Sequence, residues 1–148
     1  MFDIPEINTV FKKEIYETSI GSEEPFCDVI HFLCRIEGFK TKIKNLHWAS
    51  KDMSIHVKLD DFMSVISEYQ DSVAEDYMGI QGTMQPNVLC GIEDKSLDAL
   101  TMLQALKEAT LSFYSTLPDQ PCYKGIVSET EAFMHELNKY KYLFTLCK

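Results

Sequence analysis

Apolar residues recur at intervals of three and four through most of this chain, which is the pattern of amphipathic helices. Four long segments carry the pattern, at about residues 22–49, 54–80, 94–117 and 128–147. Gly82, Pro86 and Gly91 interrupt it before the third segment, and Pro118 ends that segment. The pattern predicts an all-α fold, with a four-helix bundle at residues 22–148 and a separate arm or flexible tail at residues 1–21.

The apolar stripe of each segment predicts the core. In the first helix it comprises Val29, Ile30, Leu33, Ile36, Phe39 or Lys40, Ile43, and Leu46 or His47. In the second it comprises Ile55, Leu59, Phe62, Ile66, Val73, Tyr77 and Ile80. In the third it comprises Leu97, Leu100, Leu103, Leu106, Thr110, Phe113 and Leu117. In the fourth it comprises Phe133, Leu137, Tyr140, Phe144 and Cys147.

Polar residues predict where the helices begin. Ser22 is the expected N-cap of the first helix and Ser54 that of the second, because a Ser oxygen accepts a free backbone N–H. The stretch from Ser128 to Glu131 has the form of a capping box that opens the fourth helix. Gly38 lies inside the first helix, where a Gly lowers helix stability by about 1 kcal/mol relative to Ala. We expect it to be there because it lets another segment pack closely against the helix.

The second helix also carries a polar stripe. With His56 taken as zero, Asp60, Asp71 and Glu75 lie at about +40°, +60° and +100° around the helix. This stripe is turned by roughly 140° from the apolar stripe. Imidazole nitrogen and carboxylate oxygen are ligands that suit Fe(II). A fifth ligand of this kind, His47, lies before the polar turn that opens the helix.

The length of the helix decides how these ligands can meet. His56 and Asp71 are about 22 Å apart at 1.5 Å per residue, too far for one metal ion. His47 and His56 flank the turn at equal distance, so they can approach each other within one chain. If Asp71 and Glu75 join them, these two residues come from a second copy related by a two-fold axis. Antiparallel pairing of two such helices would create two equivalent shared sites.

The spacing of these residues resembles that of the Dps family of mini-ferritins. The shared pattern has three parts. It begins with a Leu-His-Trp triplet, here Leu46 to Trp48. A second His with an Asp four residues later follows, here His56 and Asp60, and then an Asp and a Glu four residues apart, here Asp71 and Glu75. It covers about a quarter of the chain. The turn between the two His is shorter than is usual in that family.

The resemblance implies a ferroxidase centre between two subunits, with His47, His56 and Asp60 of one facing Asp71 and Glu75 of the other. It implies a ferritin-like bundle in which the link at residues 82–94 crosses the length of the bundle, so that the second and third helices run parallel. It also implies oxidation of Fe(II) by hydrogen peroxide or oxygen and storage of ferric iron in a hollow dodecamer. Zinc could substitute for iron at such a site.

A second interpretation stays open. Asp60, Asp71 and Glu75 could form a solvated acidic face of a non-catalytic helical assembly protein that binds zinc only adventitiously. No Glu-x-x-His pair occurs in the chain, so a di-iron centre within one subunit is not expected. We expect His31 to be a surface or interface residue, and we expect His135 not to be a ligand.

Charge and cysteine content indicate which partners and which cellular compartment to expect. The chain has 148 residues and a net charge of −9, which argues against binding to DNA or to anionic membranes. Acidic residues outnumber lysines in residues 1–21, so this segment does not read as a DNA-binding tail. The five Cys lack CxxC spacing, which predicts free thiols in a reducing cytoplasm. No transmembrane segment is expected.

Overall fold

The computed structural model describes residues 28–147, and these residues form helices joined by turns and one long link. The helices are α2 (Val29–Ala49), α3 (Met53–Gln81), α4 (Ala99–Thr116), the short 3-10 helix η1 (Pro121–Tyr123) and α5 (Lys124–Thr145). This part of the chain contains no strand, so the predicted all-α class is confirmed there. The arm predicted at residues 1–21 and the N-cap predicted at Ser22 lie outside the described residues.

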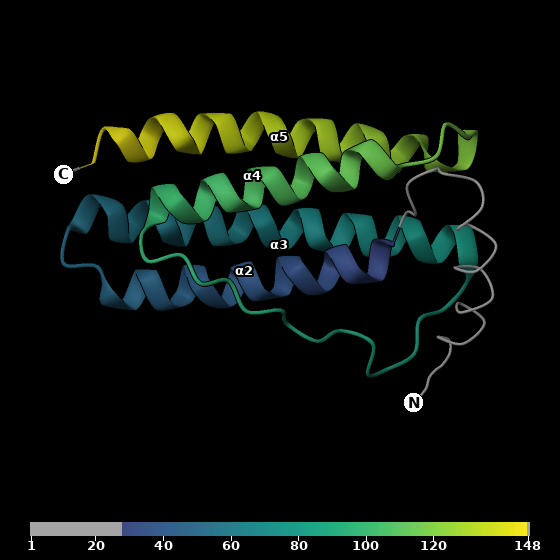
Figure 1. The fold of residues 1–148 in the computed structure, drawn as a ribbon, viewed down its shortest axis with the longest axis horizontal. Coiled ribbons are helices and arrows are strands. Elements are labelled where there is room, and N and C mark those ends of the chain that lie inside the picture. The colour runs from purple at the N-terminus through teal and green to yellow at the C-terminus, as the bar shows by residue number, and fades with distance from the viewer. Residues whose placement is uncertain (1–27, 148) are drawn as a thin grey trace.

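The four long helices pack around one apolar core (Figure 1). α2 contacts α3 and α4, and α5 contacts the same two helices from the other side. In Figure 1, α3 and α4 run in one direction while α2 and α5 run in the other. The link from Gly82 to Asp98 leaves α3 at one end of the bundle and enters α4 at the opposite end.

Asp residues cap α2 and α3, and at α3 the cap is Asp52 in place of the predicted Ser54. Asp28 has an extended backbone, and its side chain accepts the N–H of His31 at 3.0 Å, so α2 begins at Val29. Asp52 caps α3 by accepting the N–H of Ser54 at 2.8 Å, and it also accepts the Ser54 hydroxyl. A carboxylate accepts such bonds at least as well as a hydroxyl, which explains why Asp52 takes the place predicted for Ser54.

The last two helices also begin away from their predicted positions. Asp98 caps α4 through the N–H of Thr101 at 2.8 Å, a few residues after the predicted start. α5 begins earlier than predicted, at Lys124, because η1 leads directly into it. The predicted capping box at Ser128 to Glu131 is therefore wrong, and these residues lie inside the helix. Thr130 is buried there, bonded to the hydroxyl of Tyr69 at 2.7 Å.

Most of the predicted core is buried. On α3 the apolar stripe is confirmed, since its members are either fully buried or packed against the core. On α2 the prediction allowed either Phe39 or Lys40 in the core. Phe39 is buried, whereas Lys40 is only half-buried. The prediction for the start of the third stripe is wrong. Leu97 is 88% exposed because it precedes α4, and Leu100 faces outward in the first turn while Met102 and Leu103 are buried.

The long link is held against α2 by backbone contacts. The N–H of Ile92 donates to the carbonyl of Cys34 at 3.1 Å. A methyl group built on Gly38 would overlap the carbonyl oxygen of Ile92, so only Gly lets the link lie this close to α2. At the start of the link, Gly82 ends α3 with a φ of 102°, a conformation that favours Gly. Among the described residues, no helix is both long and apolar enough to cross a membrane.

The contact at Gly38 predicts a large difference between two Gly-to-Ala substitutions. Gly38→Ala should lower the free energy of unfolding by about 2–3 kcal/mol, since the new methyl group meets rigid backbone of the link. Gly79→Ala, on α3, is the matched control because open space surrounds it. It should raise the free energy of unfolding by about 0.5–1 kcal/mol through helix propensity alone. Urea unfolding measures both, and equal effects of the two substitutions would contradict the packing at Gly38.

Candidate metal centre

The two His residues that flank the turn between α2 and α3 lie against each other. The rings of His47 and His56 are stacked, with centroids 3.7 Å apart and planes 21° apart. Their hydrogen bonds are reciprocal: Nδ1 of His47 lies 2.8 Å from the carbonyl oxygen of His56, and Nδ1 of His56 lies 2.9 Å from that of His47. The structure therefore brings these two predicted ligands together within one chain.

These hydrogen bonds determine which nitrogen of each ring is free. A carbonyl oxygen can only accept, so Nδ1 must carry the proton in both rings. In the neutral imidazole, the lone pair is then on Nε2, and no described residue makes a hydrogen bond to either Nε2. Metal-binding His residues are commonly oriented in this way, with one nitrogen donating to a carbonyl and the other binding the ion. Each ring thus leaves one nitrogen lone pair without a hydrogen-bond partner among the described residues.

The predicted carboxylates lie on the outer side of α3. Asp60, one turn beyond His56, is exposed, and so are Asp71 and Glu75. α3 is continuous from Met53 to Gln81, so the distance of about 22 Å between His56 and Asp71 holds. Within the described part of one chain, no group of three or more His, Cys, Asp or Glu could hold a metal ion. One chain thus assembles the His pair but does not bring Asp71 and Glu75 to it.

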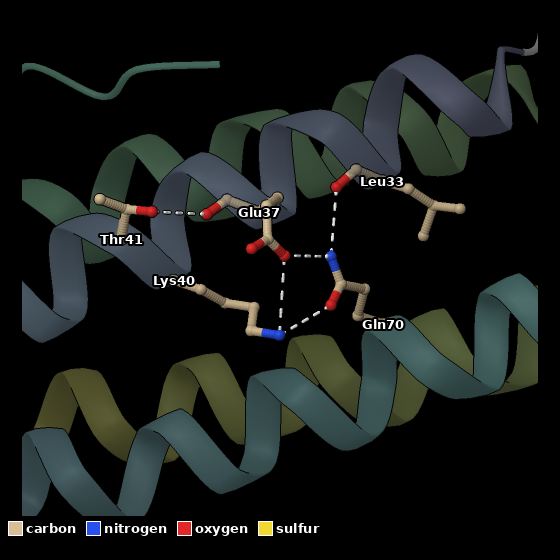
Figure 2. Close-up of polar contacts among 5 residues, drawn as sticks. All are labelled: Leu33, Glu37, Lys40, Thr41 and Gln70. Carbon is tan, nitrogen blue, oxygen red and sulfur yellow. Dashed lines mark hydrogen bonds and ion pairs between the residues drawn. The ribbon is translucent and has the colours of Figure 1, made fainter. Parts of the chain in front are cut away.

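A polar cluster around the buried Gln70 joins α3 to α2 (Figure 2). Gln70 is 6% exposed, and its Nε2 donates to the carbonyl of Leu33 at 3.3 Å and to Glu37 at 3.1 Å. Its Oε1 accepts from the Nζ of Lys40 at 2.9 Å. The amide has partners for both of its polar atoms, so it fixes the register of the two helices. The sequence did not predict this cluster, because a polar residue such as Gln70, next to an acidic stripe on a helix, is usually exposed to solvent.

Exposed apolar side chains lie close in sequence to the His pair. Trp48 and Met53 are each 71% exposed, and Val57 is also exposed. All three are neighbours in sequence of His47 or His56, at the end of α2 and in the first turns of α3. Apolar groups left in water at one place on a surface commonly mark an interaction site. The turn between α2 and α3 and the helix ends beside it therefore expose apolar side chains near the His pair.

A second acidic contact, between α3 and α5, was not predicted. Asp76 lies against Gly125, whose missing side chain makes room for its carboxylate. Oε1 of Glu129 is buried and has no hydrogen-bond partner among the described residues. Burial, together with a hydrogen bond to Asp76 and the negative charges of Asp76 and Glu75, raises the pKa of Glu129 from 4.5 to about 7. Near neutral pH the Glu129 carboxyl is therefore partly protonated beside Asp76.

This raised pKa predicts that Glu129→Gln stabilises the metal-free protein at alkaline pH. The folded pKa lies above the unfolded one, so wild type loses stability as the pH rises from about 4.5 to about 7. Gln carries no charge, so the substitution removes that loss. Allowing for solvent screening, we expect a gain of about 1 kcal/mol at pH 8 and almost none at pH 5. Urea unfolding at both pH values measures it, with the exposed Glu68→Gln as control. A gain independent of pH would contradict the raised pKa of Glu129.

The other His residues of the described chain stand apart from the centre. His31, near the start of α2, and His135, on α5, are both exposed. Comparison of the chain with models of protein families, with curated proteins and with solved structures found no match. The function is therefore inferred from the geometry of the His pair and from the resemblance of the motif around it.

Proposed function

We propose that this chain is a Dps-like ferroxidase, which oxidises Fe(II) with peroxide or oxygen and stores ferric iron in an oligomeric cage. The observation that carries the proposal is the reciprocal bonding of His47 and His56, which leaves both Nε2 atoms free to bind. An ion that binds the other nitrogen of each ring would explain why two half-buried His residues are stacked with both Nδ1 atoms held by hydrogen bonds.

The remaining ligands of the proposed site come from a second copy of the chain. The distance along α3 keeps Asp71 and Glu75 away from the His pair of their own chain. Two α3 helices packed antiparallel about a two-fold axis would bring Asp71 and Glu75 of each chain to the His pair and Asp60 of the other. The exposure of Trp48 and Met53 supports a partner at this place, since such side chains are usually covered.

Iron is the substrate of the proposed reaction. Two Fe(II) ions each lose one electron, and hydrogen peroxide with two protons accepts both electrons and becomes two waters. Neutral imidazole binds the ion, and Asp60 with Glu75 compensates the charge gained on oxidation. Asp71 binds directly or holds a water. Few protein ligands leave coordination positions open for the oxidant.

The course of the long link supports the family resemblance. The parallel direction of α3 and α4 and the link that joins their opposite ends suit the ferritin-like crossover that we propose for this fold (Figure 1). Dps proteins usually carry a short extra helix in this link. The link contains no helix here between Gly82 and Asp98, so the dimer contacts that such a helix makes must be made in another way. We propose a homo-oligomer built from two-fold dimers, with a dodecamer as its closed form.

The experiment that tests the function adds Fe(II) anaerobically to the metal-free protein and then adds peroxide or oxygen. The expected result is ferric absorbance that develops faster than in buffer and saturates at one or two ions per His pair. Solution mass measured on the same sample tests the oligomer. A monomer without accelerated oxidation would overturn the proposal, because the shared site could not form.

A second candidate is a non-catalytic helical assembly protein with the same packing. It is favoured by one observation: within the described part of a single chain, no three ligands come together. The two candidates differ in the iron experiment. An oligomer that leaves the rate of Fe(II) oxidation at its value in buffer is the result expected of the assembly protein.

A further inference from the structure

The long link contacts α2 through two cysteines as well as through Gly38. Cys34, on α2, is 8% exposed, whereas Cys90, in the link, is exposed. The N–H of Cys90 donates to Sγ of Cys34 at 3.2 Å, and Sγ of Cys34 lies 3.7 Å from the carbonyl oxygen of Val88. Both thiols are free. Residues 56 positions apart are therefore in direct contact at this point of the fold.

The distances suit a disulfide. The contact between Cys90 nitrogen and Cys34 sulfur, the N–Cα bond of Cys90 and the span of about 2.8 Å from Cα to Sγ in Cys34 together limit the separation of the two Cα atoms to about 7.5 Å. Disulfides join Cα atoms up to about 6.8 Å apart, so this limit lies within about 1 Å of the disulfide range, and Cys90 lies in the exposed link, which can adjust. The bond between Ile92 and Cys34 holds the link in place two residues further on.

We propose that Cys34 and Cys90 are a redox-sensitive dithiol, which hydrogen peroxide converts to a disulfide that fastens the link onto α2. The pair goes beyond the proposed ferroxidase site and uses none of its residues. The disulfide would close a loop that contains most of α2, all of α3 and half of the link. It would therefore prevent the link from leaving the bundle surface.

The two thiols have different roles because they differ in exposure. Cys90 meets peroxide first: its thiolate attacks one oxygen, the O–O bond breaks, and a sulfenic acid and one water form. Burial raises the pKa of the Cys34 thiol, so Cys34 stays protonated and does not react with peroxide by itself. Its sulfur then attacks the sulfur of the Cys90 sulfenic acid, the S–O bond breaks, and the second water leaves. The thiols lose two electrons and the peroxide gains them.

The test treats the reduced, metal-free full-length protein with hydrogen peroxide in the presence of a chelator. Proteolysis without reduction should then yield a linked peptide pair containing Cys34 and Cys90, with the mass of two hydrogens lost. The melting temperature should rise by roughly 5 °C or more and should return to its original value with dithiothreitol. Cys90→Ser should abolish both effects. Cys122→Ser is the matched control, since it removes an exposed thiol on η1, and it should change neither effect.

Three results would overturn the proposal. The first is Cys90 oxidised to sulfinic acid while Cys34 remains a thiol. The second is a disulfide between Cys90 residues of two chains, and the third is one that joins Cys34 or Cys90 to any other cysteine of the chain. A His47→Ala/His56→Ala variant separates this test from that of the ferroxidase. It should form the disulfide as wild type does even though its iron site is removed.

Discussion

Replacement of His56 or of Asp60 should abolish fast Fe(II) oxidation and leave the fold intact. Loss of a group that only orients a ligand already costs about 10–100-fold, so loss of a ligand should lower the oxidation rate at least about 100-fold. The fold should survive because Asp60 is exposed and the core face of α3 lies on the other side of the helix. Asp60→Asn is the sharpest variant, since it keeps the shape of the side chain and removes the charge. Stopped-flow absorbance measures the rate, and circular dichroism checks the helices.

Matched controls exist for both residues. Asp61 is the exposed neighbour of Asp60 and lies 100° further round the helix, so Asp61→Asn should oxidise iron at the wild-type rate. His135→Ala removes an exposed His from α5 and should also leave the rate of Fe(II) oxidation unchanged. Wild-type kinetics in both His56→Ala and Asp60→Asn would show that these residues are not ligands. Equal losses in all four variants would point to a general effect of surface charge.

Two inactive variants should rescue each other if the site is shared between chains. One variant lacks His47 and His56, and the other lacks Asp71 and Glu75, so each homo-oligomer contains only defective sites. In a mixed dimer, one site receives both defects and the other receives none. Random mixing makes half of the dimers mixed, so co-refolding an equal mixture should restore about one quarter of wild-type activity. The reason is the distance of about 22 Å along the unbroken helix α3.

The rescue experiment needs evidence that the chains mix. A mass difference between the variants lets native mass spectrometry count hetero-dimers in the refolded sample. A mixture of the two variants without refolding is the control, and it should remain inactive if exchange is slow. Hetero-dimers that show no activity would mean that the ligands do not meet across a two-fold axis.

Periodicity and residue chemistry alone predicted the helices and the core face of α3. Leu59, Phe62, Ile66 and Val73 recur at helical intervals, and burial of such a stripe needs no knowledge of the rest of the chain. The approach of His47 to His56 was likewise predictable, because both flank one short turn. The helix ends were less predictable. Several side chains near each end can cap it, and the neighbouring chain decides which one does, as Asp52 and η1 show.

Contacts between segments far apart in the chain were decided by the tertiary structure. The burial of Gln70 and the packing of the link on Gly38 and Cys34 depend on how α2 lies against its neighbours. The hydrogen bonds from each His Nδ1 to the other's carbonyl join residues only nine positions apart, but they too depend on the register at which α2 and α3 meet. A one-dimensional pattern records which face of a helix is apolar but not the register at which two helices meet. The sequence by itself determined four amphipathic helices and an acidic stripe with two His. The packing decided which nitrogen of each ring is free to bind and which cysteines touch.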